Sequence, residues 1–179
     1  MTNYFVFDTV NNPLYTQMTN TYTAPGIEGG AEGDAAKSGV LYVLTSGSTA
    51  VAANQNLLLQ VTNPGGSGVS MYISSITGGS SAAATVTLYS GGTVTGGTTP
   101  TPFNALFGSS NTSAMAMTTR SVSSTITGSP TTFTTLLTAG SYFYLPYAGQ
   151  LIVPPGRSIT VSVGPGALTA AANITWWER

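Results

Sequence analysis

Residues 151–163 (LIVPPGRSITVSV) constrain the fold more than any other part of the chain. Residues 158–163 alternate between hydroxyl and branched apolar side chains. This period of two predicts a β-strand with one buried face and one face in water. Pro154 and Pro155 cannot donate to a strand ladder, and Gly156 eases a reversal of the backbone. We therefore expect a β-corner or a hairpin here, near the end of an all-β domain.

Similar short apolar or alternating runs, separated by Gly, Pro and Asn turns, fill the chain from residue 40 onward. They lie at 40–44, 57–62, 69–76, 84–89, 114–119, 121–127, 133–138, 142–145, 151–153, 158–163 and 172–178. In 69–76 the apolar positions shift from odd to even, which predicts a bulge. Gly78 and Gly79 are expected to end that strand.

Many short strands with Gly and Pro turns are typical of a sandwich or barrel. The fold class predicted is therefore all-β: a single jelly-roll-like antiparallel β-sandwich with an extended N-terminal arm. The sandwich is assigned to residues 38–179 and the arm and linker to residues 1–37. A long loop at 98–112 carries three large apolar side chains that we expect to plug one end of the sandwich: Phe103, Leu106 and Phe107.

The first 37 residues differ in composition from the rest of the chain. They hold four of the five carboxylates and the single lysine, and residues 31–37 are the one helix expected. Near the start is an apolar run made of Tyr4, Phe5, Val6 and Phe7. Such a run suits pairing with an exposed sheet edge, either in its own chain or in a neighbour.

Charge is scarce throughout the chain. Charged residues make up 5% of it, against about 25% in a typical soluble domain. The formal net charge is −1, and a net charge near zero favours association. We expect a subunit that packs against copies of itself or other proteins of an assembly.

The same composition argues against most chemistry. Between Asp34 and Glu178 there is no Asp or Glu, and the chain has no His and no Cys. Paired-acid hydrolysis, a Ser-His-Asp relay and zinc ligation all require such residues. Four Lys and Arg in the whole chain are too few for a phosphate-binding surface. We expect no enzyme, no catalytic, metal or cofactor-binding residues, and no nucleic-acid partner.

The N-terminus shows no basic and apolar segment of the secretory kind, so no signal peptide is expected. No apolar run approaches the roughly 20 residues of a membrane helix, so no membrane insertion is expected.

Aromatic residues late in the chain are the remaining candidates for recognition. Trp176 and Trp177 are adjacent in the last expected strand and must face opposite sides. We assign Trp176 to the core, so Trp177 stands on the polar face together with neighbours such as Thr175. Three roles stay open for Trp177: cover within its own chain, a subunit contact, or a sugar platform. Tyr144 and Tyr147 pose the same question.

The Gly-, Ser- and Thr-rich strands, the TPTPF loop and the LIVPPGRSITV segment resemble jelly-roll structural proteins of bacteriophage virions and of bacterial or spore surface fibres. The resemblance covers about residues 40–178 by strand rhythm. It implies an assembly role and a place in a virion or an extracellular surface assembly, and it assigns no functional residues.

We therefore expect a non-enzymatic structural subunit, first of all a virion component (a decoration, fibre or tail-associated protein) docked through its N-terminal arm. The alternative is a self-polymerising subunit of a surface filament, in which Tyr4, Phe5, Val6 and Phe7 enter the next subunit's sheet. A third interpretation is a carbohydrate-binding module that uses Trp177.

Overall fold

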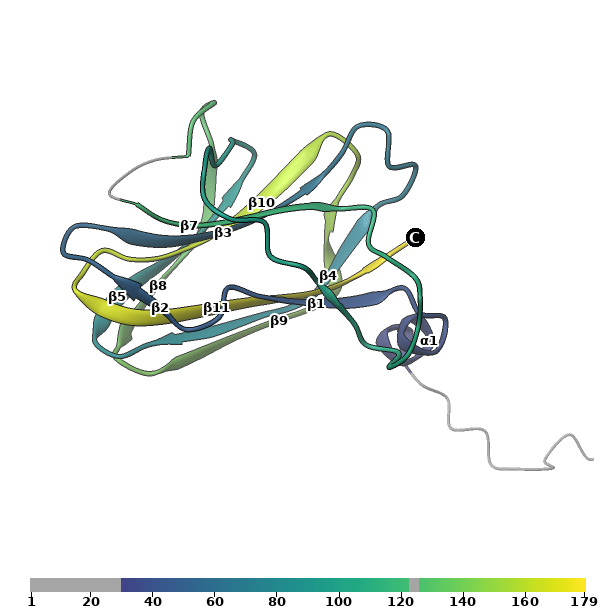
Figure 1. Cartoon of the computed structure of the whole chain (residues 1–179), viewed down its shortest axis with the longest axis horizontal. Helices are drawn as coiled ribbons and strands as arrows, with labels where there is room; N and C mark the ends of the chain where they lie inside the picture. Colours follow the sequence, from purple (N-terminus) through teal and green to yellow (C-terminus); the bar gives the residue numbers. More distant parts are fainter. Residues whose placement is uncertain (1–29, 123–125) are drawn as a thin grey trace, which may run out of the picture.

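The computed structural model describes residues 30–122 and 126–179 of the chain. They form two antiparallel sheets packed against each other, with a short helix at one end (Figure 1). In chain order the elements are α1 (Ala31–Lys37), β1 (Leu41–Thr45), β2 (Thr49–Val51), β3 (Asn56–Asn63), β4 (Met71–Ser80), β5 (Ala83–Ser90), β6 (Phe103–Asn104), β7 (Ala116–Val122), β8 (Thr131–Ala139), β9 (Tyr142–Val153), β10 (Arg157–Gly164) and β11 (Leu168–Glu178).

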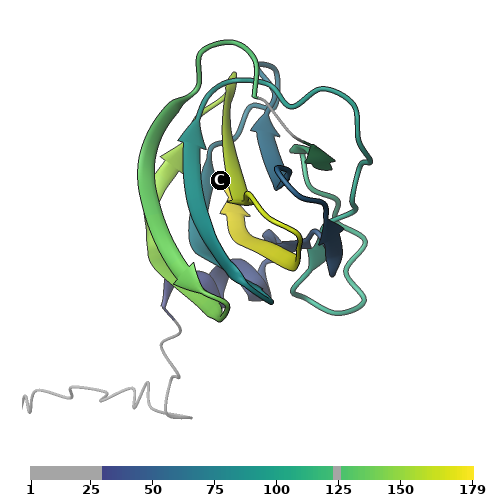
Figure 2. The same cartoon turned by 90° about the vertical axis from the view of Figure 1, so that its left-hand side faces the viewer.

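The strand order shows how the chain is wound. Sheet I has the order β6-β1-β11-β4-β9, with β2 also paired with β11, and sheet II has the order β7-β3-β10-β5-β8. Eight strands pair in a nested series: β1 with β11, β3 with β10, β4 with β9, and β5 with β8. Successive pairs alternate between the sheets, so one long antiparallel ribbon is rolled into two layers (Figure 2). This is the winding of a jelly roll, and the predicted all-β, jelly-roll-like sandwich is confirmed, whereas residues 1–29 of the predicted arm lie outside the described residues.

The core lies between the two sheets. Its largest fully buried side chain is Trp176 on β11. The inward faces of β10 and β11 are at most 2% exposed at the apolar positions expected: Ile159, Val161, Val163, Ala172, Ile174 and Trp176. The sequence alternation therefore identifies the core face of both strands correctly.

The hydroxyl face of β10 is also buried, and the prediction of a face in water is wrong there. The turn after β5 folds over this face. The Gln60 amide donates to Thr160 Oγ1 (2.7 Å) and to the Gly92 carbonyl (3.2 Å), and Ser158 Oγ donates to the same carbonyl (3.0 Å). These hydrogen bonds replace those to water, so the polar face is buried without unpaired groups.

Strand β4 carries the predicted bulge. Its register shifts between Ile73 and Ser75 opposite β9, and at the same place opposite β11. The strand then continues through Gly78 and Gly79 to Ser80, so the prediction that these glycines end it is wrong. A Cβ on Gly78 would lie 2.5 Å from Cζ of Phe143, which shows that glycine is needed because the ring occupies that space.

The strands expected at 142–145 and 151–153 are two halves of β9. Between them, residues 147–150 have no partners in the β4 register. This bulge in β9 includes Gly149, which has a φ of 82° and lies against the ring of Trp177.

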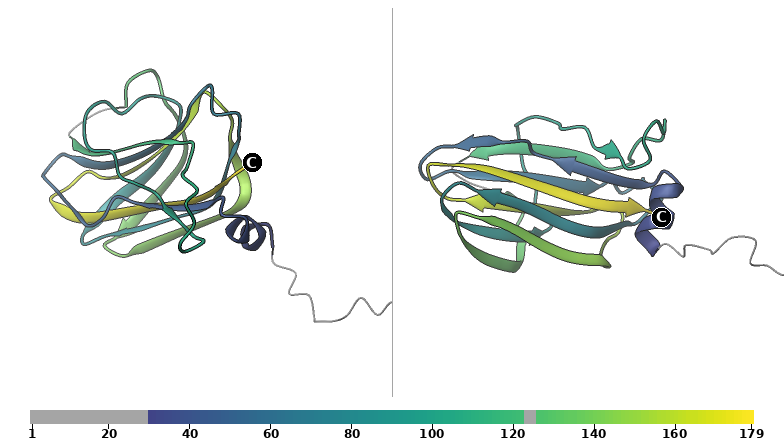
Figure 3. Two further views of the ribbon diagram at one scale, coloured as in Figure 1. Left: turned by 45° about the vertical axis from the view of Figure 1, so that its right-hand side comes forward. Right: turned by 90° about the horizontal axis from the view of Figure 1, so that it is seen from below.

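Helix α1 confirms the one helix expected from the sequence. It is packed on sheet I: Ser74 Oγ donates to Glu32 Oε1 (2.9 Å), and Ala35 is buried. The last residues of the segment assigned to the linker are thus held against the sandwich. Figure 3 shows α1 at the same end of the sandwich as the C-terminus.

Candidate interaction surface

The structure separates the aromatic residues selected from the sequence. Tyr144 projects from β9 and is 58% exposed, whereas Tyr147 is partly buried and packs against the core. The apolar run of Tyr4, Phe5, Val6 and Phe7 lies outside the described residues.

Trp177 is covered by its own chain. The residue is 8% exposed, and its ring stacks on Tyr72, with ring centroids 5.6 Å apart and an interplanar angle of 5°. The bulge at residues 147–150 of β9 brings Gly149 against the ring. Of the three roles left open for Trp177, burial by residues of its own chain agrees with these contacts. The ring has no open face that a sugar could stack on.

Exposed apolar side chains gather instead along β8 and β9, the last strands of the two sheets. We call this the β8–β9 edge and define it by five exposed residues: Phe133, Leu137, Tyr142, Tyr144 and Ile152. Leu137 and Tyr142 are 86% and 83% exposed and flank the short connection between the two strands.

The β8–β9 edge also has free backbone groups. Among the described residues, β8 ends sheet II and β9 ends sheet I, so one side of each strand is unpaired. Natural edge strands are commonly protected by charges, prolines, bulges or short length. Strand β9 has Pro146 and a bulge at residues 147–150, and β8 has a bulge at Phe133, but the nine residues of β8 include no charge and no proline. A long edge without charge favours pairing with another chain.

Sequence reasoning found only Tyr144 of this edge. Adjacent residues in a strand face opposite sides of the sheet. One member of each apolar run must therefore point outward, and this applies to Leu136-Leu137 and to Leu151-Ile152-Val153. Only the sheet order shows that the outward members share an edge.

A second apolar projection lies at the other edge of sheet I. Phe103 on β6 and Phe107 in the following loop are 57% and 82% exposed, and their rings meet edge to face at 5.1 Å. The prediction that Phe103, Leu106 and Phe107 plug the end of the sandwich is wrong. Pairing of β6 with β1 holds this loop beside sheet I instead, so these side chains stay in solvent.

The carboxylates of the described residues are all engaged in local contacts. Glu32 accepts a hydrogen bond from Ser74, and Asp34 lies 3.6 Å from the Lys37 ammonium in an exposed pair. Glu178 is buried and accepts from Ser113 Oγ (2.5 Å). Each of the three acidic side chains is therefore held in place by a contact within the fold.

Glu178 fastens the long loop to the last strand. Besides the Ser113 hydroxyl, its carboxylate accepts from the Ala114 backbone N–H (2.9 Å) and from Trp176 Nε1 (3.0 Å). Glu178→Gln should lower the free energy of unfolding by about 2 kcal/mol, because an amide nitrogen would then face a donor within a buried charged network. Urea unfolding followed by circular dichroism measures the change.

The matched control for Glu178→Gln is Asp34→Asn, which removes the same charge from an exposed ion pair. It should cost less than about 1 kcal/mol. Equal losses for the two variants would contradict the structural role given to Glu178.

Ionisation of Tyr42 makes the free energy of unfolding depend on pH in the alkaline range. Burial, and secondly the charge of Glu178, raise the pKa of the Tyr42 hydroxyl above its usual value of about 10. As the pH rises past that value, the unfolded chain loses this proton first, so the folded state binds more protons and stability falls. We expect the free energy of unfolding to decline above about pH 10 and Tyr42→Phe to reduce that decline. Urea titrations at pH 8 to 11 test this, and identical slopes in the two proteins would contradict it.

The described residues offer neither a metal site nor a membrane-spanning helix. They contain no group of three or more His, Cys, Asp or Glu placed to hold a metal ion. No helix within residues 30–122 and 126–179 is long and apolar enough to span a bilayer.

Comparison of the chain with protein-family models, with curated proteins and with solved structures found no match.

Proposed function

We propose that this protein is a non-enzymatic structural subunit that assembles through the β8–β9 edge, and that the assembly is a virion, where it serves as a decoration, fibre or tail-associated component. The observation that carries the proposal is the long, uncharged edge with five exposed apolar side chains. Contact between such an apolar surface and water is unfavourable in free energy on an isolated monomer. Pairing with another chain would bury it and satisfy the edge backbone groups.

The fold alone does not choose this function, because jelly rolls occur in capsid proteins, lectins and cupins alike. Support for a structural role comes from the chemistry of the side chains. The described carboxylates are held by local contacts, and the surface is nearly free of charge. The virion setting rests on the resemblance of the sequence to jelly-roll structural proteins.

A filament is the second candidate, favoured by the positions of the two apolar features. Strands β6 and β9 end sheet I on opposite sides. The Phe103–Phe107 pair therefore lies across the sheet from Tyr144 on the β8–β9 edge. A contact between two different surfaces of identical subunits is heterologous, and it builds a ring if it closes and a filament if it does not.

Sedimentation velocity on the full-length chain tests the proposal. The wild type should sediment as species larger than the 18.2 kDa monomer in a concentration-dependent way. The double variant Leu137→Lys, Tyr142→Lys should shift the distribution to monomer, because two charges on the edge oppose pairing. Both side chains are more than 80% exposed, so the fold should be unaffected.

The control is Ser48→Lys with Thr101→Lys, which adds the same charge at exposed positions outside the β8–β9 edge. It should sediment like the wild type. A monomeric wild type, or an edge variant that assembles as the wild type does, would overturn the proposal. Phe107→Lys separates the candidates: it abolishes a filament in which the Phe103–Phe107 pair contacts the β8–β9 edge of the next subunit, and it leaves an assembly in which the Phe103–Phe107 pair takes no part.

A further inference from the structure

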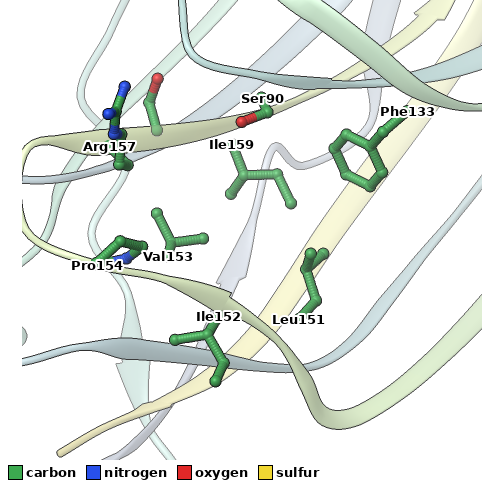
Figure 4. A pocket seen from close by; sticks show the side chains of 9 residues that line it. Ser90, Phe133, Leu151, Ile152, Val153, Pro154, Arg157 and Ile159 are labelled. Carbon is green, nitrogen blue, oxygen red and sulfur yellow. The ribbon is translucent and has the colours of Figure 1, made fainter.

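An apolar hollow opens between β8 and β9 at the end of these strands that is far from their connection. Phe133 on β8 stands across from Leu151 on β9, and Val153 and Ile159 line the space between them (Figure 4). We call this hollow the edge cleft. Phe133 reaches it because the register between β5 and β8 shifts at Leu88 and Tyr89, which leaves Phe133 without a paired residue on β5.

The edge cleft suits a few apolar side chains. Its volume is about 250 Å³, below the roughly 300–1,000 Å³ of common small-molecule sites. Val153 and Ile159 on its floor are 6% and 2% exposed, whereas Phe133 and Ile152 at its rim are 40% and 49% exposed. A ligand bound here would gain binding free energy chiefly by burying the exposed side chains of the rim. A ligand in the form of a strand alongside β8 or β9 would also form backbone hydrogen bonds with the free edge.

One cation stands at the rim. Arg157 lines the edge cleft and is exposed. The one ion pair within the described residues joins Lys37 and Asp34, so Arg157 has no carboxylate partner there. An apolar segment with an acidic residue at its end would match both the cleft and this charge.

The first residues of the chain have that chemistry. Tyr4, Phe5, Val6 and Phe7 are apolar or aromatic, and Asp8 follows them directly. The order is therefore four side chains able to cover apolar surface and then one carboxylate.

The start of the described chain places this segment within reach. Glu32 in the first turn of α1 contacts Ser74 on β4, and β4 is paired with β9. Tyr72 on β4 is opposite Ile152, which stands at the rim. Residues 8–29 can span at most about 75 Å, which is more than the diameter of a domain of this size. The segment can therefore reach the edge cleft of an adjacent copy.

We propose that the edge cleft receives Tyr4, Phe5, Val6 and Phe7 of a neighbouring copy, with Asp8 beside Arg157. This inference rests on the proposed assembly function and names the partner that the β8–β9 edge takes. Each subunit offers one segment and one cleft, so the contact is heterologous and can continue from copy to copy.

Cysteine cross-linking between full-length chains tests the contact. The chain has no native cysteine, so only the introduced residues can form a disulfide. A mixture of Val6→Cys and Ile152→Cys chains should give a disulfide-linked dimer of one chain of each kind under mild oxidation. The matched control pairs Val6→Cys with Thr101→Cys, an exposed site that does not line the cleft. The cleft pair should cross-link at least tenfold more than the control, and equal yields would overturn the inference.

A charge exchange in the same assay tests the end of the segment. Asp8→Arg and Arg157→Asp should each lower the cross-linking yield about two- to fivefold, the range of an exposed ion pair. The combination of the two changes should restore it. If the two reductions in cross-linking yield add up when both changes are present, the pairing of Asp8 with Arg157 is overturned.

The inference and the proposed function fail in different ways. If the Leu137→Lys, Tyr142→Lys variant loses assembly while the cleft pair does not cross-link, the assembly function stands and the inference is wrong. If a chain carrying both Val6→Cys and Ile152→Cys closes only on itself at all concentrations, the neighbour is excluded as the source of the segment. In that case sedimentation of the wild type decides the assembly function separately.

Discussion

Gly78→Ala should lower the free energy of unfolding by about 3 kcal/mol, at the upper end of the cost of overpacking. A Cβ at this position would lie 2.3 Å from the Ala171 carbonyl oxygen and 2.5 Å from Cζ of Phe143. The first atom belongs to the neighbouring strand β11 and the second to β9, so the added methyl group meets sheet backbone on one side and a core ring on the other. Neither can move without disturbing sheet I.

Gly79→Ala is the matched control in the same strand. Its nearest neighbours would be at 3.4 Å, which is ordinary van der Waals contact. Its effect should stay within about 1 kcal/mol. Urea unfolding of both variants measures the difference, and similar values would contradict the close packing of Phe143 on β4.

Trp176→Ala should cost about 3–5 kcal/mol, as expected when a fully buried aromatic side chain is removed. Trp176 is fully buried, its ring lies 5.9 Å from that of Tyr42, and its Nε1 donates to Glu178. The variant loses the packing volume of the core and one of the bonds that hold Glu178. At about 2–4 °C per kcal/mol for a chain of this length, the melting temperature should fall by roughly 6–20 °C.

Trp176→Phe separates packing from hydrogen bonding. It keeps an aromatic ring in the core and removes the bond to Glu178. The free energy of unfolding should fall by about 2 kcal/mol, less than for the alanine variant. Calorimetric scans of the two variants provide the comparison, and a melting temperature of Trp176→Ala within 3 °C of the wild type would contradict the assignment of this side chain to the centre of the core.

Local periodicity is enough to predict most strands and the fold class. The alternation in β10 identifies its core face, and the change of parity in β4 identifies the bulge near Ser74. The Pro154-Pro155-Gly156 turn separates β9 from β10, which belong to different sheets, so the corner was the right alternative. These features are encoded within a few residues of one another.

The wrong predictions concern contacts between distant segments. The hydroxyl face of β10 is buried by a turn some 66 residues away, where Ser158 binds the Gly92 carbonyl. Gly78 and Gly79 resemble a strand end in the sequence, but the ring of Phe143 gives Gly78 a packing role within a strand. Periodicity in one segment contains no information on such partners.

The candidate site shows the same division. Tyr144 could be placed outward from its own strand, because Phe143 takes the core side. The edge cleft could not be predicted, since it depends on which strands end the two sheets and on the register shift that frees Phe133. The cover of Trp177 by Gly149 likewise depends on a bulge in another strand, β9.

Amide hydrogen exchange as a function of protein concentration tests the central claim, that the β8–β9 edge is the assembly surface. As concentration rises, backbone amides in residues 131–153 should become protected when their free edge groups pair with another chain. Amides of β10 should not change, because this strand is already paired on both sides. Concentration-dependent protection elsewhere with none in residues 131–153 would show that the chain assembles through a different surface.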